Sequence, residues 1–315
     1  MSALNELLTG LVDFAGLFPP AAMDMESAVR AYAEYRVGPH AAYLGAFVVP
    51  AGRLEEFAGA AGRVGRRADH GPGGARSWPV SVLAGEPPDA DVARALRFSA
   101  PPGGEQGLTV VALETRALSA ATVDRVSAAV PGDVSVAFEI PLSLGRDERR
   151  ALLAAVKAAG RIAKIRTGGV TPEAIPPAIR VAEFIWDCAC AGVAFKATAG
   201  LHHPVRAEQR LTYAADSPRA VMHGFVNVFV AAAAAWALAG DEANRAADEP
   251  PAAVTGVLEE RNPLAFAIAG DTLHWRDLAV PAADIERARR KLARSFGSCS
   301  FDEPVGDLQA LGWLP

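Results

Sequence analysis

The sequence predicts an α/β fold, a (β/α)8 barrel of the TIM type, as a single domain over residues 1–315. Short β-rich runs alternate with helical patterns, which indicates βα units and a parallel sheet. Eight runs are candidate strands, the number that closes a barrel. The chain has 315 residues, of which 51% are hydrophobic, enough to bury a large core.

A doubly wound open sheet is the rival fold. Such a sheet normally carries a glycine-rich phosphate-binding turn after an early strand. Here the first candidate strand leads into Ala15-Gly16-Leu17-Phe18-Pro19-Pro20, which cannot form that turn. The barrel is therefore the better prediction.

The predicted strands are separated by helical segments and turns. They cover residues 11–15, 43–49, 79–83, 108–115, 134–141, 162–166, 193–198 and 295–300. Helices are expected at 24–36, from Arg53, at 89–98, after an N-cap at Ser119, and at 147–159, 177–191, 282–294 and 304–311. A loop rich in glycine and arginine is expected at 62–77.

The connection between the seventh and eighth strands is unusually long. Ser217-Pro218 is predicted to begin an alanine-rich helix as N-cap and first residue. Residues 265–268 and 272–275 flank Ala269-Gly270-Asp271 and predict a hairpin. Residues 241–293 are therefore interpreted as an insertion of helix and hairpin before the last strand.

Composition excludes several classes of protein. Lys plus Arg is 31 and Asp plus Glu is 36, a net charge of −5 without basic blocks, so no nucleic acid partner is expected. The first residues lack a signal-peptide pattern. Cys188 and Cys190, two apart on a predicted helix, cannot pair, and no cysteine spacing matches a zinc site. A reducing, cytoplasmic location is expected.

One uncharged segment, residues 220–240, has about the length of a membrane span. Its middle is mostly alanine, and it contains His223, Gly224 and Asn227. A buried helix is the better interpretation, with no membrane partner. Such a helix would suit a subunit contact, so a homo-oligomer is a further hypothesis.

Charged side chains share the inward faces of four adjacent predicted strands. Side chains alternate along a strand, so Lys164 lies with Arg166, and Lys196 with Ala194 and Thr198. On the two preceding strands the inward faces carry Glu114 and Glu139. Buried charges need partners, so their convergence near the carboxyl ends of the strands predicts a site for a polar ligand.

Structural interpretations compete with functional ones. Either glutamate, or Arg166, could simply pair with another barrel charge, and Asp13 on the first strand could cap a turn. His223 is expected to be a packed helix residue. The lysines are harder to explain structurally, because an inward lysine occupies core and needs a partner. The remaining candidate substrate-binding residues, beside Arg166 and Asp13, are Thr167, Gly168, Gly169, Thr198, His202, His203 and Ser298.

These motifs resemble those of class I aldolases, and most of all the deoxyribose-phosphate aldolase family. That family has K-T-S-T-G and K-A-S-G-G-I on strands six and seven, where this chain has Lys164-Ile165-Arg166-Thr167-Gly168-Gly169 and Lys196-Ala197-Thr198-Ala199-Gly200-Leu201. The resemblance covers about 65 residues. It implies that Lys164 forms the Schiff base and that Lys196 lowers its pKa. Arg166 replaces a small polar residue of the family, and Glu114 stands where the family uses aspartate.

The residues themselves also support imine chemistry, independently of the family resemblance. Free lysine is protonated at neutral pH, and a nearby cation with partial desolvation lowers its pKa. Glu114 or Glu139 could carry protons, and Arg166 with the amides of Thr167, Gly168 and Gly169 could hold a carboxylate or phosphate. The sequence therefore predicts a lyase, an aldolase that forms an imine with a small anionic carbonyl substrate, an oxo acid or sugar phosphate, without a cofactor.

Alternatives remain open. The lysines could act only electrostatically in a cofactor-free isomerase or decarboxylase. The barrel could bind an anion or transfer a phosphoribosyl group without covalent chemistry, or it could be a noncatalytic binding protein. No metal is expected, because adjacent histidines such as His202 and His203 rarely share one ion and no third ligand follows at a recognisable spacing.

Overall fold

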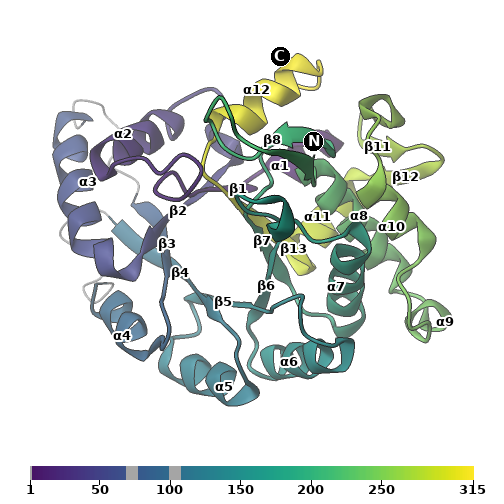
Figure 1. Cartoon of the computed structure of the whole chain (residues 1–315), viewed down its shortest axis with the longest axis horizontal. Helices are drawn as coiled ribbons and strands as arrows, with labels where there is room; N and C mark the ends of the chain where they lie inside the picture. The colour runs from purple at the N-terminus through teal and green to yellow at the C-terminus, as the bar shows by residue number, and fades with distance from the viewer. Residues whose placement is uncertain (1, 69–76, 99–107) are drawn as a thin grey trace.

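Eight parallel strands close into a barrel in the computed structural model, which describes residues 2–68, 77–98 and 108–315 (Figure 1). The order around the barrel is β1-β13-β7-β6-β5-β4-β3-β2, which confirms the predicted fold class. The strands are β1 Val12–Phe14, β2 Leu44–Pro50, β3 Trp78–Leu83, β4 Leu108–Arg116, β5 Ser135–Glu139, β6 Ile162–Arg166, β7 Phe195–Thr198 and β13 Ala293–Ser298.

Helices surround the barrel and alternate with its strands (Figure 1). Those between β1 and β7 are α2 Met25–Tyr35, α3 Leu54–Ala68, α4 Asp89–Phe98, α5 Ala120–Ala129, α6 Arg146–Ala158 and α7 Ala178–Ala191. Ser119 caps α5 as predicted, because its side chain accepts a hydrogen bond from the Thr122 amide. A short helix before β1, α1 Ala3–Leu8, was not predicted, and α12 Asp302–Ala310 follows the last strand.

The connection from β7 to β13 carries two small antiparallel sheets and four helices among the described residues. These are β8 Ala207–Arg210 with β9 Arg219–Met222, then α8 Phe225–Leu238, α9 Glu242–Arg245, α10 Ala252–Glu259, the sheet β10 Phe266–Ala269, β11 Thr272–Trp275 and β12 Leu278–Pro281, and α11 Ala282–Lys291. The predicted hairpin is present as β10 and β11, and β12 adds a third strand. The last barrel strand begins and ends two residues before the predicted one.

Three predicted boundaries differ from the structure by three residues or more. Ser217-Pro218 does not begin the alanine-rich helix. Its Ser217 hydroxyl accepts from the Thr212 amide and the Pro218 carbonyl accepts from Leu211, so both close the turn between β8 and β9. Helix α8 begins instead at Phe225, after Gly224. Helix α11 ends at Lys291 rather than 294, and α3 extends to Ala68, into the predicted loop at 62–77. Residues 69–76 of that loop lie outside the described residues.

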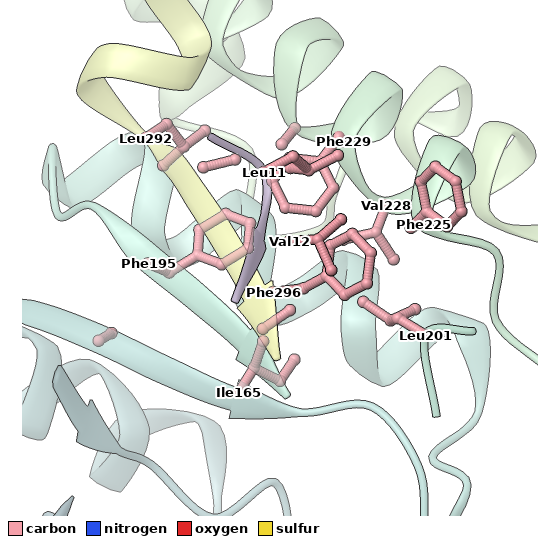
Figure 2. Close-up of a cluster of buried hydrophobic side chains, with 14 of the residues drawn as sticks. Leu11, Val12, Ile165, Phe195, Leu201, Phe225, Val228, Phe229, Leu292 and Phe296 are labelled. Atoms are coloured by element: carbon pink, nitrogen blue, oxygen red, sulfur yellow. The ribbon is translucent and has the colours of Figure 1, made fainter. Parts of the chain in front are cut away.

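Helix α8 packs inside the molecule, against the outer face of β13. Phe225 stacks on Phe296 with ring centroids 5.2 Å apart, and Phe229 lies beside the same ring (Figure 2). Residues 225–235 are all buried, and α7, α10 and α11 contact the helix from other sides. The chain itself therefore covers the surface on which the expected subunit contact depended. Within the described ranges, no helix is long and apolar enough to cross a membrane.

The strands present apolar side chains to the surrounding helices. On β6 and β7 these are Ala163, Ile165, Phe195 and Ala197, all fully buried (some are drawn in Figure 2). Because side chains alternate, the residues between them point into the barrel. This alternation places a layer of charge, rather than a layer of branched apolar residues, at the middle of the barrel.

Candidate active site

Glu114 of β4 lies at the centre of a buried ionic cluster. One of its carboxylate oxygens, Oε2, is 2.9 Å from Lys164 Nζ, and the other, Oε1, is 2.5 Å from Lys196 Nζ. The Ser81 hydroxyl of β3 also donates to Oε1 at 2.7 Å. The three charged residues are 2 to 4% exposed, so the pairs are buried. One carboxylate therefore bridges two lysines inside the barrel.

The strand register explains why these residues meet. Lys164 and Lys196 are direct partners across β6 and β7, and Glu139 is the partner of Lys164 across β5 and β6. Their neighbours along the strands face the helices. Lys164, Lys196 and Glu114 lie at the inward positions that alternation predicted. Both lysine side chains are long enough to reach Glu114 of β4 across the barrel.

Asp13 of β1 holds Lys196 from the other side. Its Oδ2 is 2.7 Å from Lys196 Nζ and accepts from the Ser295 hydroxyl of β13 at 2.7 Å, while Oδ1 accepts from the Ala46 amide of β2 at 2.7 Å. Gly45 makes room for this carboxylate, since a Cβ at that position would overlap it. Asp13 is thus an ion-pair partner of a barrel lysine rather than a turn cap.

The cluster fixes the charge of two of its members. Burial opposes the charge on Glu114, but Lys196, Lys164 and the Ser81 hydroxyl outweigh it and hold the pKa of this carboxyl well below its usual range. Burial likewise opposes the charge on Lys196, yet Asp13 and Glu114 outweigh it and raise the pKa of this lysine. Glu114 is therefore an anion and Lys196 a cation at neutral pH.

Glu139 and Arg166 lie nearer the carboxyl ends of the strands. Glu139 Oε2 is 3.2 Å from Lys164 Nζ, and Glu139 Oε1 is 3.7 Å from Arg166 Nε. The side chain of Arg166 is 55% exposed, in contrast to the lysines. Lys164 therefore touches two carboxylates, and the outer one is also in contact with a guanidinium that water reaches.

A cavity of about 260 Å³ opens above the cluster at this end of the barrel. Lys164, Lys196 and Glu114 form its charged floor. Apolar side chains form one wall, and loop residues after β6, β7 and β13 form the other. The remaining lining residues are Ala15, Phe18, Pro19, Val48, Leu83, Arg166, Gly169, Val170, Thr198, Ala199, His202, Gly297 and Cys299. Its size suits a small ligand that presents one polar end to the lysines.

Hydrogen bonds and a backbone contact join the loop after β6 to the end of β7 and the loop that follows it. Thr167 is fully buried, its amide donates to Thr198 O at 2.9 Å, and its hydroxyl donates to Ala199 O at 2.6 Å. Gly168 and Gly200 touch along their backbones, and Gly200 has a φ of +74°, so neither position accepts a side chain without strain. Thr167 therefore has no donor left for an anion. Of the predicted anion-binding residues, Arg166 and Gly169 line the cavity.

His202 contributes a further charged group to the cavity. Its Nδ1 is 3.2 Å from Glu303 Oε2 of α12, 3.5 Å from the Ser298 hydroxyl and 3.8 Å from Cys299 Sγ. Burial opposes a charge on this ring, but the contacts with Cys299 and Glu303 outweigh it and raise the pKa of His202 to about 9. The imidazole is therefore an imidazolium at neutral pH and carries a positive charge at the cavity wall.

The other predicted residues lie in different places. His203 points to Asp307 of α12, with Nδ1 2.6 Å from Oδ2, and it does not line the cavity. Ser298 is buried behind His202, between the lining residues Gly297 and Cys299. His223 is packed as expected: its Nε2 lies 2.8 Å from the Pro176 carbonyl, and burial lowers its pKa to about 4.

Sequence reasoning missed the apolar lining of the cavity and four polar residues of this site: Ser81, Ser295, Cys299 and Glu303. Ser81 had a signal, because it is a polar residue between Val80 and Val82 on a strand and so shares the inward face. Glu303 had none, since its contact with His202 depends on how α12 folds back over the barrel. Nowhere in ranges 2–68, 77–98 and 108–315 do three or more metal-ligating side chains gather to hold an ion.

Comparison of the chain with protein-family models, with curated proteins and with solved structures finds no match. The class that the fold and the site define is that of a TIM barrel, common among enzymes, with a buried lysine–carboxylate cluster beneath a small cavity.

Proposed function

We propose that the protein is a lyase of the class I aldolase type, in which Lys164 forms an imine with a small oxo acid or sugar phosphate. The observation that carries the proposal is the position of Lys164. Its amine lies on the floor of a cavity of about 260 Å³, next to a second lysine that Asp13 and Glu114 keep charged. Of the two, Lys164 has the longer contacts with its carboxylates, 2.9 and 3.2 Å against 2.5 and 2.7 Å for Lys196, and is the proposed nucleophile.

Glu139 is the proposed acceptor of that proton. It lies 3.2 Å from Lys164 and, unlike Glu114, is not bridged by a second lysine. Glu114 is held as an anion by three contacts and is better suited to orient both ammonium groups. The neutral amine of Lys164 would then attack the substrate carbonyl, and loss of water from the carbinolamine would give the imine.

Arg166 and His202 are proposed to hold the anionic end of the substrate. Both line the cavity, and both carry positive charge at neutral pH. A carboxylate or phosphate between them would leave the carbonyl carbon directed toward the lysine floor. The apolar side chains of Phe18, Val48 and Leu83 would cover the carbon skeleton and exclude water from the imine.

A second function is favoured by one specific observation. Lys164 is paired with two carboxylates, at 2.9 and 3.2 Å, an arrangement that also suits a lysine acting only as a fixed charge. In that case the protein would be a cofactor-free isomerase or decarboxylase, whose lysines stabilise an enolate.

Borohydride trapping separates the two functions. Incubation with small aldehydes and oxo acids, followed by reduction, should add the mass of the reduced adduct to the peptide that contains Lys164. The Lys164→Met variant should show no such addition. Turnover of a carbonyl substrate without any adduct would exclude the aldolase and leave the electrostatic function.

A further inference from the structure

A second cavity, of about 550 Å³, lies at the opposite end of the barrel. It is lined by the first residues of several strands, among them Leu44 of β2, Ser135 of β5 and Ile162 of β6. The loops at 132–134 and 160–161, which lead into β5 and β6, complete its rim. This cavity therefore opens at the amino-terminal mouth of the barrel, away from the candidate substrate cavity.

The inner wall of this lower cavity is the ionic cluster itself. Glu114 and Lys196 line both cavities, Asp13 lines only the lower one, and Lys164 lines only the upper one. The Glu114–Lys196 pair is thus the partition between two spaces that open at opposite ends of the barrel.

Small side chains leave the lower half of the barrel open. TIM barrels normally fill this region with layers of bulky branched residues. Here the lining includes five residues with small side chains or none: Gly45, Ala46, Ser81, Ala112 and Ala137. The hydroxyls of Ser81, Ser135 and Ser295 and the carboxylate of Asp13 add polar partners, which water in a protein interior requires.

We infer that the lower cavity is a water-filled passage through which solvent reaches Asp13, Glu114 and Lys196 from the amino-terminal mouth. Water can then reach the lower side of the cluster while a ligand fills the upper cavity. The passage follows from the lining residues alone and does not depend on imine chemistry.

Thiol labelling tests the passage. Ala137 is 1% exposed and lines only the lower cavity, so the Ala137→Cys variant would place a thiol inside the passage. The probe is a small cationic methanethiosulfonate, and the labelled peptides are identified by mass. Ala163→Cys is the matched control, because Ala163 is a fully buried barrel-strand alanine that lines neither cavity.

The passage predicts that the thiol at position 137 reacts at least about tenfold faster than the thiol at position 163, which reacts only through local opening. Equal rates would overturn the inference. Ala112→Cys, on the same cavity wall, provides the same comparison if the first variant does not fold.

Two further substitutions, each added to Ala137→Cys, identify the direction of entry. Ser135→Trp places an indole at the lower mouth, two residues before position 137 on the same face of β5, and should slow labelling. Thr198→Trp fills the upper cavity and should leave the labelling rate unchanged. Slowing by Thr198→Trp but not by Ser135→Trp would show that the reagent enters from above and would overturn the inference.

Discussion

Lys164 and Lys196 are register partners on β6 and β7, and each places its ammonium group on a different oxygen of Glu114. The two cations therefore share an anion, which offsets the repulsion expected between them from the sequence. The lysines differ in their second partner, which is Asp13 for Lys196 and Glu139 for Lys164. This difference is the basis for assigning the nucleophile.

Glu114→Gln should destabilise the fold, because it leaves two buried lysines without their shared anion. Loss of one partner from a buried ion pair costs about 3–5 kcal/mol. Urea denaturation at pH 7 measures the change. Glu56→Gln is the control, since Glu56 pairs with Arg53 at the surface, where ion pairs contribute little. Equal midpoints for Glu114→Gln and the wild type would contradict this account of the cluster.

The same carboxylate predicts the acid sensitivity of the fold. The folded pKa of Glu114 lies below its ordinary value of 4.5, so its contribution to stability is present above that pH. The contribution is lost as the pH falls from 4.5 toward the folded pKa. The stability difference between wild type and Glu114→Gln should therefore shrink below about pH 4.5. A difference that stays constant from pH 7 to pH 3 would show that the pKa of Glu114 is not lowered in the folded protein.

The sequence predicted the barrel and its inward charges because both depend on local alternation. Lys164, Lys196 and Glu114 share the period-two pattern of their own strands, and parallel strands in sequence order must be neighbours. The β7–β13 connection was less predictable. Ser217-Pro218 is a good helix start. In the structure, however, the Ser217 hydroxyl accepts from the Thr212 amide, five residues earlier in the chain, and closes the turn between β8 and β9. The contact between His202 and Glu303 depends on tertiary packing, so no local sequence pattern predicts it.

His202 should make anion binding depend on pH. The pKa of His202 is raised to about 9, above its ordinary 6.5, so its positive charge persists through neutral pH and is lost as the pH rises through about 9. Sulfate binding, measured by calorimetry, should weaken over that range in the wild type and show no such step in His202→Gln. His223→Gln is the control, because burial keeps His223 neutral at these pH values. An identical step in His202→Gln would assign the pH dependence to another group.

Arg166→Ala should weaken inhibition by phosphate or sulfate by about tenfold, the usual value of a charge-assisted hydrogen bond. Arg166→Lys should recover part of the loss, since lysine supplies the charge without the paired donors of a guanidinium. Arg116→Ala should have little effect, because Arg116 lies in the neighbouring groove with Arg166 but does not line the cavity. Unchanged inhibition in Arg166→Ala would place the anion site elsewhere.

Treatment with a chelator should leave activity intact. The carboxylates nearest the lysines, Asp13, Glu114 and Glu139, are each engaged with an ammonium group, and His202 is engaged with Glu303. Turnover before and after dialysis against a strong chelator measures this. Complete loss of activity that zinc or manganese restores would require a metal-dependent mechanism instead.

The most direct measurement is the site of imine formation. Wild-type protein is incubated with a small aldehyde or oxo acid, reduced with borohydride, and digested for peptide mass analysis. The account predicts an adduct on Lys164 that disappears in Lys164→Met. Lys196→Met should retain the adduct only at higher pH, because Glu114 then pairs with Lys164 alone and opposes the loss of its proton. An adduct on Lys196 would reverse the two roles. Turnover of a carbonyl substrate with neither lysine labelled would contradict the proposed aldolase.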